Sequence, residues 1–298
     1  MVMKEVVNTK TVLHVPKWKF TKQKTNFSVE NLFILGAGMV VIFIILCALF
    51  PKWIAPYSPT FMDTFLILSP PNSAHWFGTD YFGRDVLSLV IYGSSDSLII
   101  GIASVLIGGL IGGIIGSVSG YFGGIIDVVL MRLIEILMTI PGILLALAIA
   151  AALGPGLMNI VLAVAVSSIP GYARVMRGQL MSIKKRKYVE ASRSIGTPEW
   201  RIFLWHLLPN SWSPLLVMAT IGLGTSILIG SGLSFLGLGI IKEIPDWGAL
   251  LSQGRGYLTV GWWISTFPGL AITLFVLSVN IIGDKLRDTF DPKTSRTR

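Results

Sequence analysis

Side chains that could carry out chemistry are few in this 298-residue sequence, and they lie far apart. The three histidines, His14, His75 and His206, fall on different segments, and the single cysteine, Cys47, has no partner for an internal disulfide. The sequence contains no G-x-x-x-x-G-K-[ST] phosphate loop, no H-E-x-x-H zinc motif and no G-x-S-x-G nucleophile motif. We therefore expect no catalytic residue, no metal site and no cofactor bound by this chain, and a membrane enzyme is poorly supported.

A few charged residues border the hydrophobic stretches. Asp96, Asp127, Arg132 and Glu135 lie near the ends of stretches that are long enough to span a membrane. Charged groups inside a membrane are usually functional, but groups near the interface can also reach water. Two interpretations stay open: plain interfacial anchoring, or a role for Asp96, Arg132 and Glu135 along a transport path.

Glycines recur at every fourth position along one hydrophobic stretch. At helical spacing they would form a stripe almost free of side chains, which lets two membrane helices approach closely. The contact could be a fixed one within the chain, or one that changes when a helix bundle opens. The residues of this predicted packing stripe are Gly108, Gly112, Gly116, Gly120 and Gly124.

A polar insert, residues 188–210, interrupts the apolar part of the chain and follows the basic run Lys184 to Lys187. Residues 188–195 suit a short helix that ends at Gly196 in a left-handed conformation. A second short helix is expected from Pro198 to about residue 207. Two short helices that expose aromatic and apolar groups predict either a docking surface for another protein or an amphipathic element on the lipid surface.

The ends of the second short helix carry two further signals. Thr197 can cap it, with Pro198 at its first position and Glu199 in its first turn. Pro209 is expected to close the insert before the next hydrophobic stretch begins.

The elements that must position these residues are membrane helices. The chain is 53% hydrophobic and 13% charged, against about 25% charged in a typical soluble domain. Long gaps without Asp, Glu, Lys or Arg each hold at least one span of about 20 residues. The sequence predicts an all-α membrane protein with six spans, at about 32–50, 98–119, 133–153, 157–176, 214–238 and 263–283.

Orientation follows from the placement of the basic residues. Of the 24 Lys and Arg residues, 20 fall on one predicted side, with both termini and the insert, and four fall on the other. Both ends of the chain are therefore predicted to be cytoplasmic. The net charge of +9 reflects topology and attraction to the lipid bilayer rather than binding to nucleic acid, because the basic residues flank the spans.

The insert is similar to the EAA loop of ABC importer permeases. Glu190-Ala191-Ser192 is followed at the family's spacing by Gly196 and by His206-Leu207-Leu208-Pro209, with Ser192 and His206 departing from the usual Ala and Ile. Further stretches from about residue 30 to 292 resemble the dipeptide/oligopeptide/nickel branch. They are GTDYFGRDVLS, IPGYARVMRGQ, GLSFLGLG, PDWGALL and FPGLAITLFVLSVNIIGDKLRDTFDP. The long segment after the first span, with its GTDYFGRD motif, resembles the C-type subunit.

The resemblance implies a type I ABC importer permease fold, in which this chain would form half of the translocation pore. The partners would be a non-identical B-type permease, two ABC ATPase subunits that hold ATP and magnesium, and an extracytoplasmic solute-binding protein. Contact with the ATPases is implied for the loop residues Glu190, Ala191, Ser192, Gly196, Trp200, His206, Leu208 and Pro209. A stand-alone channel or facilitator is the alternative from another class of protein, and it would need no ATPase.

The resemblance leaves the solute open. The family carries dipeptides, oligopeptides, glutathione, nickel and metal–opine chelates, and the sequence has no His, Cys or Met cluster suited to bare nickel, which favours a peptide or a chelate. The predicted division of the chain is a cytoplasmic tail (1–31), a first span with its extracytoplasmic segment (32–93), an ABC transmembrane domain (94–284) and a second cytoplasmic tail (285–298).

Overall fold

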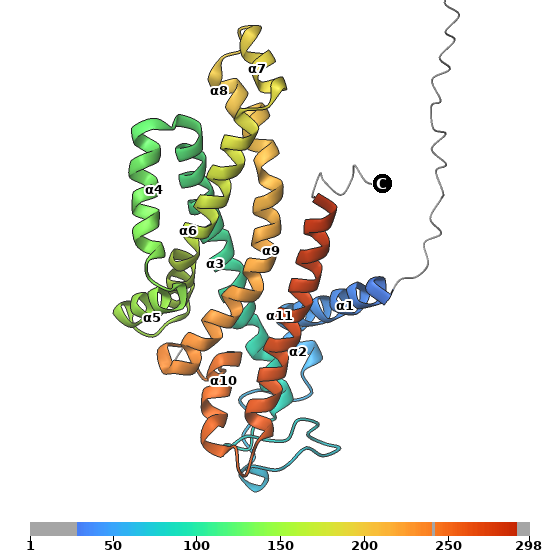
Figure 1. The fold of residues 1–298 in the computed structure, drawn as a ribbon. Coiled ribbons are helices and arrows are strands. Elements are labelled where there is room, and N and C mark those ends of the chain that lie inside the picture. The colour runs from blue at the N-terminus through green and yellow to red at the C-terminus, as the bar shows by residue number, and fades with distance from the viewer. Residues whose placement is uncertain (1–28, 240–241, 291–298) are drawn as a thin grey trace, which may run out of the picture.

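Four long helices run side by side through the protein, and between them they position every candidate site (Figure 1). The computed structural model describes residues 29–239 and 242–290, so most of both predicted tails lies outside the described residues. The long helices are α3 (Val86–Phe122), α6 (Leu157–Lys184), α9 (Leu208–Leu233) and α11 (Trp263–Phe290). The all-helical membrane fold predicted from the sequence is confirmed over this part of the chain.

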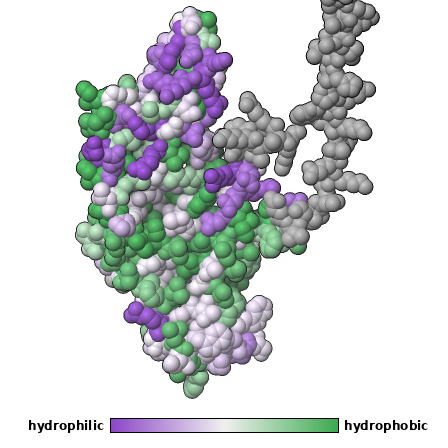
Figure 2. Space-filling view, viewed as in Figure 1, coloured by the Kyte–Doolittle hydropathy of each residue, from purple (hydrophilic) through white to green (hydrophobic). Residues whose placement is uncertain are grey.

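The hydrophobic helices match the predicted spans except at one place. Within residues 29–239 and 242–290, five helices are long and apolar enough to cross a membrane, and a bent pair would make a sixth. The first of the five is α1 (Val29–Leu49), which packs on α11 and α3 and leaves most of its side chains exposed. Figure 2 shows apolar side chains across the middle of the molecule and a polar end above them.

The predicted span at 133–153 is not one straight helix. This part of the chain forms α4 (Gly124–Met138) and α5 (Gly142–Leu153), which are bent by 86° at the break. Pro141 stands at the N-cap of α5, and its ring lacks the N–H that a continuous helix would need there. Asp127 and Arg132 interrupt the hydrophobic stretch in the first part of α4, so the span predicted from the sequence begins only at residue 133.

Gly124 does not belong to the glycine stripe, which corrects that prediction. Gly123 and Gly124 both have positive φ, at 66° and 54°, and they reverse the chain between α3 and α4. No atom lies within 4 Å of the position that a Cβ on Gly124 would occupy. Glycine is needed there for its backbone conformation and not for close packing.

The other stripe glycines seat α6 against α3. A Cβ on Gly112 would lie 2.6 Å from the Ile169 carbonyl oxygen, and one on Gly120 would lie 3.0 Å from the Leu180 Cβ. Gly108 and Gly116 face α6 in the same way. The stripe therefore makes a contact within the chain, in which the α6 backbone fills the space that side chains would take.

Short helices and turns close the end of the molecule opposite α7 and α8 (Figure 1). These elements are α2 (Pro51–Ile54), η1 (Thr64–Leu66), η3 (Ser234–Leu238), α10 (Trp247–Gly254) and η4 (Arg255–Tyr257). The buried Arg84 pairs with Asp80 at 2.7 Å and donates to the Glu243 carbonyl oxygen, which joins the two loop regions. Trp247 Nε1 donates to the Val90 carbonyl oxygen at 2.8 Å and so fixes α10 on α3.

Candidate functional site

The polar insert folds into two short helices around Gly196. α7 (Lys187–Ser194) and α8 (Glu199–Ile202) are joined by the four residues 195–198. Gly196 has φ 81°, its N–H donates to the Arg193 carbonyl oxygen, and the Thr197 N–H donates to the Ser192 carbonyl oxygen. These two bonds form a Schellman motif, in which the left-handed glycine satisfies the last carbonyls of the helix. The predicted left-handed Gly196 is confirmed.

An ion pair fixes the angle between the two short helices. Arg193 at the end of α7 donates to the two carboxylate oxygens of Glu199 at the start of α8, from Nε at 2.7 Å and from Nη2 at 3.2 Å. Such a two-pronged contact adds geometric definition as well as energy. α7 and α8 are therefore held as one unit across the Gly196 turn.

This unit is anchored on the end of α6 and leaves several large apolar side chains exposed. Val189, Ile202 and Leu207 are fully buried in one cluster with Leu180 and Ile183 of α6. The large side chains of the insert that remain exposed are Tyr188, Ile195, Trp200, Leu204 and Trp205, of which Ile195 is 83% exposed and Trp205 71% exposed. Figure 2 shows the polar side chains that surround this end of the molecule.

The second half of the insert differs from the prediction at both of its ends. Thr197 does not cap α8: Pro198 is the N-cap residue, and no side-chain cap bond forms. Pro209 does not close the insert either, because α8 continues through η2 (Phe203–Leu207) directly into α9. η2 is a π-helical turn. Its wider spacing allows the helix to continue past Pro209, although Pro209 has no N–H to donate.

The predicted contact residues of the insert lie at one end of the molecule. Glu190 stands exposed in the first turn of α7, and the Ser192 hydroxyl donates to the Tyr188 carbonyl oxygen. The His206 ring lies 6.3 Å from the Tyr188 ring and is half-buried. The others range from half-buried to exposed: Ala191, Gly196, Trp200, Leu208 and Pro209.

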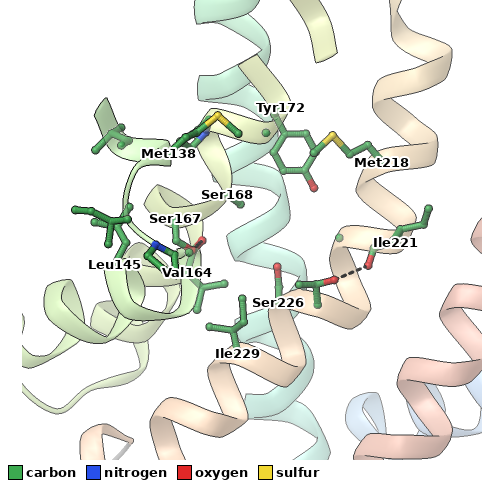
Figure 3. Close-up of a pocket in the computed structure, with 18 residues that line it drawn as sticks. Met138, Leu145, Val164, Ser167, Ser168, Tyr172, Met218, Ile221, Ser226 and Ile229 are labelled. Carbon is green, nitrogen blue, oxygen red and sulfur yellow. Dashed lines mark hydrogen bonds between the residues drawn. The ribbon is translucent and has the colours of Figure 1, made fainter. Parts of the chain in front are cut away.

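A cavity of about 460 Å³ lies between the α4–α5 break, α6 and α9 (Figure 3). Its walls are largely apolar, with Met138, Leu145 and Met218 among the lining residues, and no charged side chain lines it. The polar groups that it holds are the hydroxyls of Ser167, Ser168, Tyr172, Thr225 and Ser226.

Tyr172 was not among the residues predicted for a site. Its side chain is only 1% exposed, and its hydroxyl has no hydrogen-bond partner among the described residues. The hydroxyl points from α6 toward the space that Ile221 and Ser226 border (Figure 3). The tyrosine falls within the IPGYARVMRGQ stretch, but one sequence gives no signal that this hydroxyl is buried beside a cavity.

The charged residues proposed for a transport path lie elsewhere. Asp96 binds Lys242 at 3.1 Å, and Arg132 binds Glu135 at 3.1 Å on an exposed face of α4. None of these residues lines the cavity. Across the described ranges, no group of three His, Cys, Asp or Glu side chains is placed to hold a metal ion.

The fold is similar to that of chains from two solved ABC transporters. It resembles a chain of the MetNI methionine ABC transporter in an inward-facing form, with a TM-score of 0.56 and 22% identity over 68% of this chain and 97% of that one. It also resembles a chain of an amino acid ABC transporter crystallised with histidines, with a TM-score of 0.51 and 20% identity over 71% of this chain and 93% of that one.

Sequence comparison then gives the family. Residues 112–296 match the family described as binding-protein-dependent transport system inner membrane component, and the chain belongs to it. It is 41% identical to the probable D,D-dipeptide transport system permease protein DdpC of Escherichia coli K12, over 86% of each chain. It is 43% identical to the glutathione transport system permease protein GsiD of an E. coli O6 strain, over 87% of this chain and 86% of that one.

Membership settles the class predicted from the insert and the other motifs. The chain is an inner-membrane, multi-pass permease subunit of an ABC importer, homologous to C-type subunits. ATP hydrolysis resides in partner subunits.

Proposed function

We propose that this chain forms half of the pore of an importer for dipeptides, oligopeptides or glutathione, and that residues 188–210 couple it to two ATPase subunits. A B-type permease and an extracytoplasmic solute-binding protein complete the complex, and both termini face the cytoplasm. The names of the relatives support the substrate class, since one is a D,D-dipeptide permease and another is a glutathione permease.

The observation that carries the coupling role is a set of large apolar side chains that stay exposed on a helix pair packed against α6. Trp200 is 57% exposed and Trp205 71% exposed, and exposed apolar surface of this kind marks sites that meet a partner. The buried Val189 and Ile202 fix the helix pair on α6, so that a push on the pair is transmitted to α6. The lipid-surface alternative explains the tryptophans but gives no reason for this rigid mounting on α6.

Side-chain packing connects the insert with the cavity. The buried cluster that holds Val189 and Leu207 continues along α6 through Leu180 and Met176 to Tyr172, which lines the cavity. Movement of the insert therefore has a continuous packed route to the cavity wall. This route supports alternating access, in which closure of the ATPases changes the exposure of the pore.

The cavity supports a peptide rather than a bare metal ion. It holds hydroxyl groups and carries no His, Cys, Asp or Glu among its lining residues. Nickel or a metal–opine chelate remains the second candidate, since the family includes importers of these solutes.

Co-purification followed by transport tests the proposal. A tagged copy of this chain is purified from cells that express the complete set of subunits, and the complex is reconstituted with its binding protein. We expect two ATPase subunits to co-purify and labelled dipeptide or glutathione to be taken up only with ATP. A chain that purifies alone and moves solute without ATP would instead be a facilitator, and uptake of nickel or a chelate in place of peptide would identify the second candidate.

A further inference from the structure

The Tyr172 hydroxyl is a buried polar group without a partner. Among the described residues it makes no hydrogen bond, although the side chain is only 1% exposed. A buried tyrosine hydroxyl usually finds a partner, because an unpaired polar group destabilises the folded state. The hydroxyl therefore calls for an explanation in terms of something that this chain does not itself supply.

Two neighbouring helices make room for the tyrosine. A Cβ on Gly112 of α3 would lie 2.7 Å from the Tyr172 Cβ, and a Cβ on Gly222 of α9 would collide with the hydroxyl itself. A Cβ on Gly109 of α3 would lie 3.7 Å from the Tyr172 Cε1, which is ordinary van der Waals contact. The absence of side chains at these glycines lets the helices close around the ring, which is only 1% exposed, so the hydroxyl is placed before any solute arrives.

The hydroxyl faces a cavity whose other polar groups complement it. Ser167 donates to the Val164 carbonyl oxygen and Ser168 to the Ala165 carbonyl oxygen, both at 2.8 Å. Because each serine proton is used within α6, the serine oxygens are left as acceptors. The Tyr172 hydroxyl can still donate a proton, so the cavity offers an unused donor beside acceptors.

This set of groups suits a neutral amide. A secondary amide presents a carbonyl oxygen that needs a donor and an N–H that needs an acceptor. No charged side chain lines the cavity, so its hydrogen-bonding groups can pair with the amide of a peptide and not with its charged ends. The chemistry of the cavity thus matches the repeating unit of a peptide.

We propose that the Tyr172 hydroxyl contacts the solute during transport and donates a hydrogen bond to an amide carbonyl, while the Ser167 and Ser168 hydroxyl oxygens accept from amide N–H groups. The assignment rests on the proposed function, since it takes the cavity to be part of the transport path. It deepens that function by naming the part of the substrate that the pore recognises.

Tyr172→Phe tests the assignment because it removes the oxygen and leaves the ring. The matched control is Tyr92→Phe, the same change on α3 at a residue that does not line the cavity. Each variant is assembled into the complete complex with its binding protein and reconstituted, and ATP-driven uptake of a labelled dipeptide is measured. Loss of one neutral hydrogen bond predicts uptake by Tyr172→Phe about 2- to 12-fold below wild type, with Tyr92→Phe unchanged.

Thermal unfolding of the same complexes separates a transport role from a structural one. Because the hydroxyl has no partner among residues 29–239 and 242–290, Tyr172→Phe should unfold at the wild-type temperature or above it. Wild-type uptake by Tyr172→Phe would overturn the assignment, and so would reduced uptake together with a lowered unfolding temperature. Failure of the wild-type complex to transport any peptide or glutathione would instead reject the proposed function, which keeps the two failures distinct.

Discussion

Asp127 of α4 and Arg177 of α6 form a two-pronged ion pair, in which Arg177 Nε and Nη2 each lie 2.5 Å from a carboxylate oxygen of Asp127. Ser119 of α3 also donates to Asp127. The pair stands directly after the reversal at Gly123 and Gly124, where no other atom lies within 4 Å of either missing Cβ. It therefore holds the start of α4 against α6 where the glycines leave the backbone free to bend.

Exchange of the two charges tests this contact. Asp127→Arg or Arg177→Asp alone places two like charges together, and we expect each to lower stability by about 1.5–3 kcal/mol, the range for a hydrogen bond to a charged group. The double exchange restores opposite charges and should recover part of the loss. Thermal unfolding of the purified complex measures all three variants. Losses that simply add in the double variant would show that the two residues do not interact.

The glycine stripe gives a prediction about packing. Gly112→Leu or Gly116→Leu should impair assembly or transport, because the added side chain would collide with the α6 backbone. Overpacking of this kind typically lowers the free energy of unfolding by about 1–3 kcal/mol. Gly36→Leu on α1 is the control, since no atom lies within 4 Å of the position of its missing Cβ. Yield of the assembled complex and its uptake rate are the measurements. Normal assembly and transport by both stripe variants would mean that α3 and α6 do not rely on this contact.

The sequence was informative where a pattern is local. Gaps without charge located most spans, and the position of Gly196 after a short amphipathic segment indicated its left-handed turn. The α4–α5 bend was missed because charges on an amphipathic helix look like a loop between spans. The ion pair joins Asp127 to Arg177, and the Tyr172 ring packs against Gly222. In each case the two residues lie about 50 positions apart in the sequence, so no local spacing reveals the contact.

The insert gives a prediction about coupling. Glu190→Lys reverses an exposed charge in the first turn of α7, and Gly196→Arg adds bulk and forces a residue with a Cβ to φ 81°. The backbone strain alone is roughly 1–2 kcal/mol. We expect both variants to be made and inserted normally, and to show at least tenfold lower ATP-driven uptake or loss of the ATPase subunits on purification.

Gly196→Asn provides the matched control for that experiment. Asparagine tolerates the left-handed conformation better than other residues with a Cβ, so this variant should retain much of its transport. Uptake at the wild-type level with a full set of ATPases in both Glu190→Lys and Gly196→Arg would remove the coupling assignment. Residues 188–210 would then be better explained as an element on the lipid surface.

The predicted orientation can be tested by cysteine labelling from outside the cell. In a Cys47→Ala background, single cysteines at Ser73 or Thr259 should react with an impermeant reagent, and one at Ser182 should not. All three side chains are exposed in the structure, so a difference in reaction reports the side of the membrane. Labelling of Ser182 in intact cells would reverse the orientation drawn from the basic residues.

Asp246 gives a prediction about pH. It caps α10 by accepting from the Ala249 N–H through one carboxylate oxygen, while its other oxygen is buried without a partner among the described residues. Burial raises the pKa of Asp246, and the charge of Asp96 raises it further, against the opposing hydrogen bond from the Ala249 N–H. Since the pKa is higher in the folded than in the unfolded protein, this group favours folding at low pH, and that contribution is lost as pH rises through the raised pKa.

Asp246→Asn should remove that dependence and keep the cap, because asparagine serves at an N-cap about as well as aspartate. At neutral pH we expect the variant to unfold at the wild-type temperature or above it. Its gain in the free energy of unfolding should be at most about 1–3 kcal/mol, because no charged carboxylate is buried. The difference should shrink as pH falls toward 4, where the wild-type carboxyl takes up its proton. Unfolding temperatures of both complexes between pH 4 and 8 measure this. A variant that is less stable at neutral pH, with a gap that closes only at low pH, would show instead that the ionised carboxylate stabilises the start of α10.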